Sequence, residues 1–203
     1  MNRSAIVLAG GASRRFGSDK LVARIDGSTL LERAIGALAG LVDEVVVVTA
    51  PGRAVPREAS GGQEASGGRG ATVRFVADDE AFGGPLVGLR TGLAAAGGRT
   101  VIVVGGDMPS LVPAVLTLLL GRPPAALADS TGTLRPLPCS LERQPALEAA
   151  GMLLAGGERR LRALLAELGT TALSWPEWQA LDPPGLSLVD IDEPGDLPET
   201  PGG

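Results

Sequence analysis

Two glycines, two arginines, a third glycine and a lysine follow the first apolar run of the chain. They are Gly10, Gly11, Arg14, Arg15, Gly17 and Lys20. Glycine lets the backbone approach a ligand closely, and successive N–H groups of such a loop can point at one anion. Arginine adds a planar fork for phosphate oxygens, and lysine adds a point charge. A plain glycine turn needs no cations, so these residue types favour phosphate binding.

The loop fits neither of two widespread phosphate-binding patterns. The dinucleotide pattern G-x-G-x-x-G needs glycines at offsets that the pair Gly10-Gly11 does not supply. The Walker pattern needs a lysine directly after its last glycine and then Ser or Thr. Here Ser18 and Asp19 separate Gly17 from Lys20, and a leucine follows. Any metal ion must therefore be held by residues elsewhere in the chain.

Carboxylates at two later places could hold that ion. Asp107 follows the buried strand expected at 100–104, and Asp190 and Asp192 flank Ile191 in a last strand expected at 187–191. Alternate residues of a strand share a face, so Asp190 and Asp192 would point the same way and need a cation between them. Two simpler interpretations stay open, in which Asp107 belongs to a turn and Asp192 caps a helix begun at Pro194.

Composition excludes several classes of function. The 203 residues carry a net charge of −5, which does not favour binding to nucleic acid or to an anionic membrane. The chain has no histidine, which excludes Ser–His–Asp and Cys–His chemistry and leaves hard cations held by carboxylates as the expected metals. The single cysteine, Cys139, and the lack of a signal peptide predict a cytoplasmic protein without disulfides. No apolar run is long enough to span a membrane.

The pattern of elements predicts one α/β domain. Buried strands are expected at 4–9, 44–49, 72–76, 100–104 and 125–128, and helices at 29–39, 86–96, 110–120, 144–154 and 159–168. Such alternation is typical of a Rossmann-like three-layer sandwich with a mainly parallel sheet. Ligands of these sheets bind outside the carboxyl ends of the strands, which is where Gly10–Lys20 and Asp107 fall.

Three segments depart from this regular pattern. Residues 50–71 are rich in glycine and serine, so we expect a flexible insertion within a domain spanning 1–197. Residues 198–203 form a disordered tail. The segment 134–140 holds Pro136 and Pro138, which argues against a central strand there.

Taken in order, the motifs resemble one enzyme family along nearly the whole chain. They are Leu8-Ala9-Gly10-Gly11-x-x-Arg14-Arg15-x-Gly17-x-Asp19-Lys20, Gly84-Pro85-Leu86, Gly106-Asp107-Met108-Pro109 and Val189-Asp190-Ile191-Asp192-x-Pro194. Together they are similar to the nucleotidyltransferases of the nucleotide-diphospho-sugar transferase fold, and most similar to the molybdenum cofactor guanylyltransferases. Asp19-Lys20, Arg135-Pro136-Leu137 and the segment 157–162 favour the latter.

The resemblance implies transfer of GMP from GTP to molybdenum-bound molybdopterin, with release of pyrophosphate. It implies Mg²⁺ or Mn²⁺ as cofactor, and molybdenum-insertion proteins or molybdoenzyme chaperones as partners. It also implies a role for each site residue. Leu8, Ala9, Gly10, Gly11 and Asp78 would contact the nucleotide, Arg15 and Lys20 would neutralise its phosphates, Asp107, Asp190 and Asp192 would hold the metal, and Gly84, Pro85, Arg135 and Arg159 would face the pterin.

Two other functions stay open at this point. Aspartates at the positions of Asp190 and Asp192 are common among related cytidylyltransferases, so a cytidylyltransferase acting on molybdopterin or on a sugar or polyol phosphate is the nearest alternative. A non-catalytic nucleotide- or cofactor-binding partner is an alternative of another class. Such a binder has no use for a metal-binding carboxylate opposite a triphosphate, which favours an enzyme.

Overall fold

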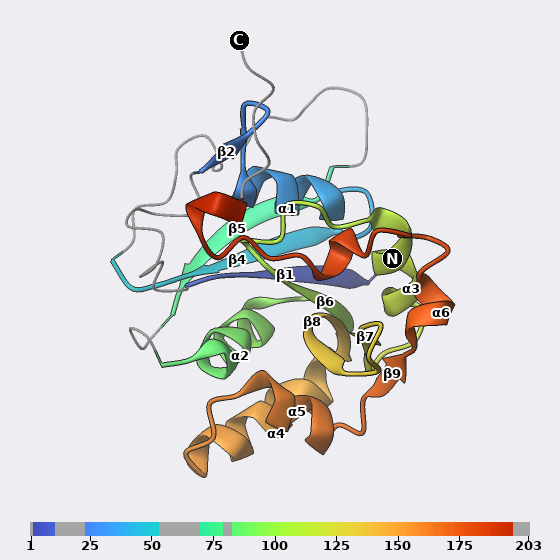
Figure 1. Cartoon of the computed structure of the whole chain (residues 1–203). Coiled ribbons are helices and arrows are strands. Elements are labelled where there is room, and N and C mark those ends of the chain that lie inside the picture. Colours follow the sequence, from blue (N-terminus) through green and yellow to red (C-terminus); the bar gives the residue numbers. More distant parts are fainter. Residues whose placement is uncertain (1, 11–22, 53–69, 79–82, 197–203) are drawn as a thin grey trace.

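A seven-stranded sheet forms the centre of the described part of the molecule (Figure 1). The structure is a computed structural model that describes residues 2–10, 23–52, 70–78 and 83–196. The strands of the sheet are β1 (Arg3–Ala9), β4 (Glu44–Thr49), β5 (Thr72–Ala77), β6 (Thr100–Gly105), β7 (Ala125–Ala128), β8 (Leu134–Glu142) and β9 (Thr171–Leu173). Their spatial order is β5-β4-β1-β6-β8-β7-β9. A separate small hairpin joins β2 (Arg24–Ile25) and β3 (Ser28–Thr29).

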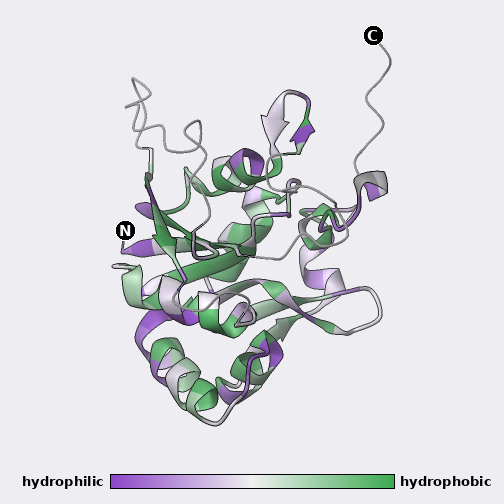
Figure 2. Ribbon diagram, turned by 90° about the vertical axis from the view of Figure 1, so that its left-hand side faces the viewer, coloured by the Kyte–Doolittle hydropathy of each residue, from purple (hydrophilic) through white to green (hydrophobic). Residues whose placement is uncertain are grey.

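Four neighbouring strands run parallel, and this part of the sheet carries the predicted site. β1 pairs in parallel with both β4 and β6, and β4 pairs in parallel with β5. β8 is antiparallel to β6 and to β7. The strands β1, β4 and β6 are almost wholly buried, as expected for parallel strands covered on both faces. Figure 2 shows these central strands coloured mainly as hydrophobic.

Helices cover both faces of the sheet and give the three layers predicted from the sequence. The helices are α1 (Leu30–Leu38), α2 (Pro85–Ala95), α3 (Pro113–Leu120), α4 (Arg143–Ala155), α5 (Leu161–Glu167) and α6 (Trp175–Trp178). One core joins α1, α3 and α6 to the first face of the sheet. A second core joins α2, α4 and α5 to the other face. The prediction of a single α/β fold with a mainly parallel sheet is therefore confirmed.

The expectation that 134–140 avoids the centre of the sheet is wrong, because β8 lies between β6 and β7. The prolines are tolerated because of the pairing register. β8 pairs with β6 only over residues 139–142, beginning with Cys139 opposite Val103. Its register against β7 shifts between Ala126 and Ala128. Pro136 and Pro138 thus fall in an irregular stretch where fewer ladder hydrogen bonds are required of β8.

The strand predicted at 187–191 is also absent from the described structure. A 3₁₀ turn, η2 (Leu186–Leu188), and irregular backbone replace it, followed by a second turn, η3 (Pro194–Asp196). The buried carboxylate of Asp182 accepts hydrogen bonds from the backbone N–H groups of Leu186 (3.0 Å) and Ser187 (2.7 Å). Local bonds of this kind compete with a sheet ladder for the same donors. Asp190 and Asp192 therefore do not share a strand face.

Some predictions fall on residues outside the described ranges. These include most of the insertion predicted at 50–71 and the tail at 198–203. No helix within the described ranges is both long and apolar enough to cross a membrane.

Candidate active site

The carboxyl ends of the four parallel strands bring two predicted site segments together. β1 ends at Ala9, and Gly10 follows it. β6 ends at Gly105, and the backbone N–H of Gly106 donates to the carbonyl of Leu8 at 3.0 Å. Gly10 and Asp107 therefore leave adjacent strands at the same edge, as the sequence predicted. Gly11, Arg15 and Lys20 lie outside the described residues.

Asp107 is held closely against its own strand. A Cβ built on Gly105 would lie 2.4 Å from Oδ1 of Asp107, so the carboxylate occupies space that only a glycine leaves open. The carbonyl of Asp107 accepts a hydrogen bond of 2.9 Å from the backbone N–H of Ile191. This bond joins the end of β6 to the late segment of the chain that carries Asp190 and Asp192.

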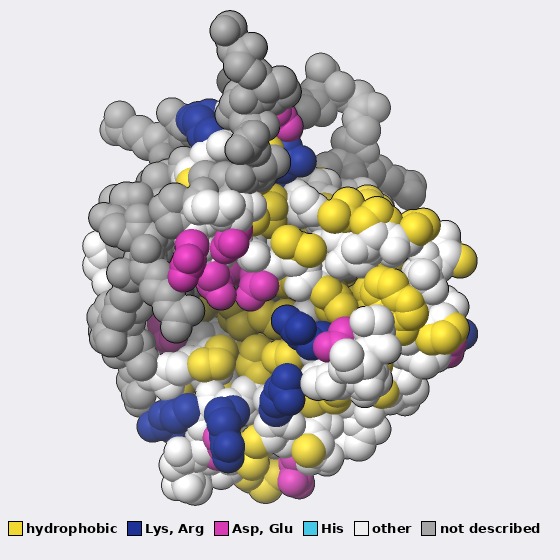
Figure 3. Space-filling view, in the orientation of Figure 1, with side chains coloured by type: hydrophobic (Ala, Val, Ile, Leu, Met, Phe, Trp, Pro, Cys, Tyr) yellow, Lys and Arg dark blue, Asp and Glu magenta, His cyan; other side chains and the backbone are white. Residues whose placement is uncertain are grey.

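Electrostatics shows that the three aspartates are neighbours. Partial loss of hydration raises the pKa of Asp190, and the negative charges of Asp192 and Asp107 raise it further. A backbone hydrogen bond and the Arg135 guanidinium act in the opposite direction. Carboxylates that repel one another in this way are stabilised by a bound cation. Figure 3 shows acidic side chains gathered in one patch on this face of the molecule.

The carboxylates of Asp107, Asp190 and Asp192 are not arranged as a complete set of metal ligands in the described structure. No group of three such side chains within the described ranges is arranged to hold a metal ion. The donor chemistry of Asp107, Asp190 and Asp192 nevertheless fits a hard divalent cation, because all three side chains offer carboxylate oxygens. The phosphate oxygens of a nucleotide would supply further ligands of the same kind.

A chain of hydrogen bonds fixes the segment that carries Asp190 and Asp192. Beyond Asp182, the hydroxyl of buried Ser187 accepts a hydrogen bond of 3.1 Å from the backbone N–H of Val112, next to α3. At the other end, Oδ2 of Asp196 accepts from the N–H groups of Asp192 (2.9 Å) and Glu193 (2.8 Å). Asp196 thus satisfies the N–H groups at the start of the turn that contains Pro194.

Asp78 is the next residue after β5 and lies at the same edge. Its backbone N–H donates to the carbonyl of Thr49 at 2.8 Å, which continues the pairing of β5 with β4. The hydroxyl of Thr91 in α2 donates to Oδ1 of Asp78 at 2.9 Å. A Cβ built on Gly88 would lie 3.4 Å from Oδ2 of the same carboxylate. The Asp78 side chain is therefore packed against α2 in one defined orientation.

The structure joins the turn at Gly84 and Pro85 to Arg159. The N–H of Leu86 donates to the carbonyl of Arg159 at 3.2 Å, and a Cβ on Gly84 would lie 3.1 Å from Cβ of Arg159. The Glu158 carboxylate fixes this turn by accepting from the N–H of Arg159 at 2.8 Å. Hydrogen bonds from Arg160, above all, hold the pKa of Glu158 at about 2.

Arg135 belongs to the acidic side of the site. Its Nη1 lies 3.7 Å from Oδ2 of Asp129. Its positive charge partly offsets the rise in the pKa of Asp190. Figure 3 shows basic side chains close to the acidic patch and further basic side chains below it. Arg135 therefore lies within electrostatic reach of both Asp129 and Asp190.

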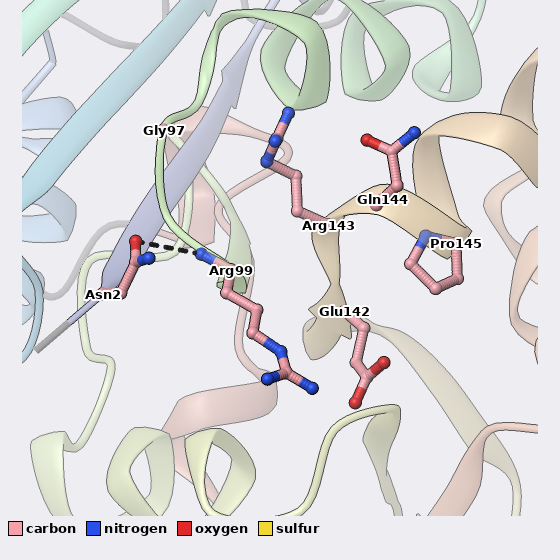
Figure 4. A pocket seen from close by; sticks show the side chains of 7 residues that line it. All are labelled: Asn2, Gly97, Arg99, Glu142, Arg143, Gln144 and Pro145. Atoms are coloured by element: carbon pink, nitrogen blue, oxygen red, sulfur yellow. Dashed lines mark hydrogen bonds between the residues drawn. The ribbon is translucent and has the colours of Figure 1, made fainter.

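Two other features of the molecule lie away from this edge. Burial raises the pKa of the Cys139 thiol to about 12, so that cysteine is a core residue without nucleophilic character. A pocket of about 330 Å³ opens at the opposite edge, between the start of β1 and the start of α4 (Figure 4). Its lining residues are Asn2, Gly97, Arg99, Glu142, Arg143, Gln144 and Pro145, none of which was predicted as a site residue.

Sequence reasoning missed four residues that support the site. Thr91 and Gly88 belong to α2, whose sequence is typical of a helix that only packs against a core. Asp182 and Asp196 lie in turns, where aspartate is common. The spacing Gly88-x-x-Thr91 places both residues on one face of α2, which is the only signal that could have connected them. Asp78, which contacts both Gly88 and Thr91, lies ten or more residues before them in the sequence, so these contacts depend on the tertiary fold.

Comparisons with known proteins identify the family of the chain. Residues 5–172 match the MobA-like NTP transferase domain family. A probable molybdenum cofactor guanylyltransferase from Chloroflexus aggregans is 38% identical over 211 residues, covering 97% of this chain and 92% of the relative.

Two solved structures share the fold. Molybdopterin-guanine dinucleotide biosynthesis protein A from Archaeoglobus fulgidus superposes with a TM-score of 0.70 at 21% identity, covering 96% of this chain and 94% of its own. A 4-diphosphocytidyl-2C-methyl-D-erythritol synthase from Anaerococcus prevotii gives 0.68 at 13% identity, covering 96% and 92%. The chain is a nucleotidyltransferase and belongs to the MobA-like NTP transferase domain family.

Proposed function

We propose that the chain transfers GMP from GTP to molybdenum-bound molybdopterin, forming the guanine dinucleotide cofactor and pyrophosphate. The observation that carries the proposal is the bond from the Ile191 N–H to the Asp107 carbonyl, which brings three carboxylates to the edge where Gly10 leaves β1. The name of the relative from Chloroflexus aggregans supports guanine as the base and molybdopterin as the acceptor. The identity of 38% over nearly the whole of both chains strengthens that assignment.

The reaction needs positioning and charge neutralisation more than covalent work by the protein. The terminal phosphate of the pterin attacks the α-phosphorus of GTP, a new P–O bond forms, and the bond to the β-phosphate breaks as pyrophosphate leaves. A phosphate monoester is already anionic, so the chain needs no histidine base. Leu8, Ala9, Gly10 and Gly11 would approach the nucleotide through their backbone.

Cations of the chain would act on the departing group and on the acceptor. Arg15 and Lys20 would neutralise the triphosphate and then the pyrophosphate, which lowers the barrier by stabilising developing charge. Gly84, Pro85 and Arg159 would form the rim that faces the pterin, and Arg135 would attract its phosphate. Molybdenum-insertion proteins and molybdoenzyme chaperones are the protein partners that this activity implies.

A divalent cation would be held by Asp107 with Asp190 or Asp192, and Mg²⁺ is the expected ion, with Mn²⁺ as a substitute. When bound, such an ion polarises phosphoryl oxygens and neutralises charge in the transition state. The carboxylates of the chain would hold it, and the hydrogen bond from the Ile191 N–H to the Asp107 carbonyl joins the two segments that carry them.

Pyrophosphate release from GTP, measured with purified molybdenum-bound molybdopterin, tests the proposed function. We expect Asp107→Ala to lose at least about 100-fold in rate, because removal of one charge-stabilising group in an enzyme costs this much. Lys20→Ala should weaken both rate and GTP affinity. Asp26→Asn is the matched control, because Asp26 is exposed in the β2–β3 turn and its φ of 51° suits asparagine.

The same assay separates the alternatives. Faster turnover of CTP than of GTP would assign the chain as a cytidylyltransferase. The feature that supports this alternative is aspartate, rather than asparagine, at positions 190 and 192. Nucleotide binding without pyrophosphate release would assign it as a non-catalytic partner. Normal turnover of a folded Asp107→Ala protein at saturating Mg²⁺ would contradict the metal assignment.

A further inference from the structure

We propose that Thr91 is a positioning residue that fixes Asp78 for recognition of the guanine base. This inference rests on the proposed function and adds the residue that sets base selection. It starts from two observations, the hydrogen bond of 2.9 Å from the Thr91 hydroxyl to Oδ1 of Asp78 and the close approach of Oδ2 to Gly88.

The sheet places Asp78 at the distance of a base from the phosphate end of the site. β5 is separated from β1 by β4 alone, and neighbouring strands are about 4.8 Å apart, so Asp78 lies about 10 Å along the edge from Gly10. A nucleotide with its phosphates at Gly10 and Asp107 extends its ribose and base across the end of β4. The base then meets the end of β5, where Asp78 is the first residue.

Helix α2 determines which carboxylate oxygen faces that edge. α2 begins at Pro85, near the edge, and runs away from it beneath β1 and β4. Gly88 therefore lies about 4.5 Å nearer to the edge than Thr91, which is three residues later. Oδ1 is bonded on the side of Thr91, and Oδ2 lies on the side of Gly88. The Thr91 bond and the Gly88 contact thus hold the carboxylate in one orientation at the carboxyl edge, with Oδ2 on the side nearer to that edge.

The chemistry of the base explains why the orientation matters. Guanine presents two adjacent donors, N1–H and the 2-amino group, which match the two acceptor oxygens of an ionised carboxylate. Oδ1 can accept from Thr91 and from the base at once, because each carboxylate oxygen has two lone pairs. Cytosine presents an amino donor beside an unprotonated ring nitrogen, so the second oxygen of Asp78 would face a lone pair. A carboxylate held in one plane therefore selects guanine over cytosine.

Gly92 sets how closely α2 packs on the sheet, and Gly88 lies beside Asp78. A Cβ built on Gly88 would be in ordinary contact with Oδ2 of Asp78 at 3.4 Å, with Val48 and Leu8 next to it. Gly92 lets α2 pack so closely that a Cβ there would lie 2.7 Å from Cγ2 of Ile6. The close helix brings the Thr91 hydroxyl within hydrogen-bond distance of a residue that follows β5.

Equilibrium binding in the absence of the acceptor tests the proposal, because no transfer can occur. The probes are GTP, CTP and inosine triphosphate, which lacks the 2-amino group of guanine. For Thr91→Val we expect GTP affinity to fall roughly 3- to 10-fold and the GTP-to-inosine triphosphate preference to fall toward one. Thr91→Ser keeps the hydroxyl and should restore both values. Asp78→Asn should abolish the preference outright.

Thr117→Val is the matched control. Thr117 is also a helical threonine whose hydroxyl is bonded, in this case to the carbonyl of Pro113 at 2.9 Å in α3, so its loss should leave nucleotide preference unchanged. Melting temperatures of all four variants identify any that fail to fold, and Thr91→Ser then carries the comparison.

The outcomes separate this inference from the proposed function. A wild-type protein that prefers CTP contradicts the proposed function, whatever Thr91 does. A wild-type protein that prefers GTP, with the same preference in folded Thr91→Val, overturns the inference alone. An equal loss for all three nucleotides also overturns it, because Asp78 would then contact a part of the nucleotide that they share, such as the ribose.

Discussion

At the scale of residues, the site is built by polar side chains that lie against glycines. Asp107 covers Gly105, Asp78 lies against Gly88, and Arg159 lies against Gly84, with distances to a built Cβ of 2.4, 3.4 and 3.1 Å. A Cβ at Gly105 or Gly84 would press on the side chain that is proposed to act, whereas a Cβ at Gly88 would only be in ordinary contact with Asp78. The glycines of this site therefore fix positions as well as allow backbone turns.

Gly84 gives the sharpest test of this idea. Its φ of 93° is a conformation that other residues adopt only with strain, and a Cβ would also lie 3.3 Å from the carbonyl oxygen of Arg159. We expect Gly84→Ala to lower the free energy of unfolding by about 1–3 kcal/mol and to raise KM for the pterin acceptor. The affinity for GTP should change little. Urea unfolding and steady-state kinetics with each substrate varied measure these effects.

Gly27→Ala is the control for Gly84→Ala. Gly27 has a similar φ of 83°, but nothing lies within 4 Å of a Cβ built on it. The control therefore introduces backbone strain without displacing Arg159, and KM for the acceptor should stay at the wild-type value. An equal rise of KM in both variants would show that strain alone, and not the contact with Arg159, accounts for the effect.

At the scale of elements, local patterns in the sequence predicted the parallel half of the sheet well. Four apolar runs, each followed by turn residues, correspond to β1, β4, β5 and β6 with small shifts at their ends. The first helix, predicted at 29–39, begins where Thr29 forms a capping box with Glu32. The pattern T-x-x-E that signals such a cap is present in the sequence.

The antiparallel half and the late segment were predicted less well, for a physical reason. Whether β8 tolerates Pro136 and Pro138 depends on its register against β6 and β7, which no local pattern reveals. The path of 182–191 depends on a buried aspartate that binds backbone N–H groups, and such contacts form only in the folded chain. The neighbourhood of Asp107 and Asp190 was nevertheless expected correctly from their motifs.

Replacing a helical glycine by alanine should change the free energy of unfolding in opposite directions in α2 and in α1. Gly92→Ala would place a Cβ 2.7 Å from Ile6 and 3.0 Å from Val48, so we expect overpacking to lower the free energy of unfolding by about 1–3 kcal/mol. A Cβ built on Gly36, at an exposed position of α1, meets nothing within 4 Å, so Gly36→Ala should raise the free energy of unfolding by about 0.5–1 kcal/mol through helix propensity. Chemical unfolding of the two variants measures both. Stabilisation by both would show that α2 can move away from the sheet.

At the scale of the whole molecule, the two edges of the parallel sheet have different tasks. The carboxyl edge carries the repelling aspartates and the rim that is proposed to face the substrate. The opposite edge is joined by a network around Glu44, whose Oε1 accepts from the Ser4 hydroxyl (2.6 Å) and the Gly97 N–H (2.5 Å). Its Oε2 accepts from Nε (3.1 Å) and Nη2 (2.9 Å) of Arg74. The network connects β1, β4, β5 and the end of α2.

The Glu44 network makes the stability of the whole fold depend on pH. Burial of Glu44 raises its pKa, but the hydrogen bonds from Ser4 and Gly97 and the Arg74 guanidinium outweigh this and hold the pKa below its ordinary value of 4.5. A carboxyl whose pKa is lowered by folding stabilises the fold above its unfolded pKa and loses that effect as pH falls through its folded pKa. The contribution should therefore be complete at pH 7 and fade below about pH 4.5.

Glu44→Gln tests this dependence. At pH 7 the amide cannot accept all the donors that face it, so we expect the free energy of unfolding to fall by about 1–3 kcal/mol. The difference from wild type should shrink as pH is lowered below about 4.5, because wild-type Glu44 then becomes protonated as well. Glu167→Gln, at an exposed position in α5, should match wild type throughout. Urea unfolding between pH 3 and pH 7 measures all three proteins, and a difference that does not vary with pH would assign the effect of Glu44 to packing rather than to its charge.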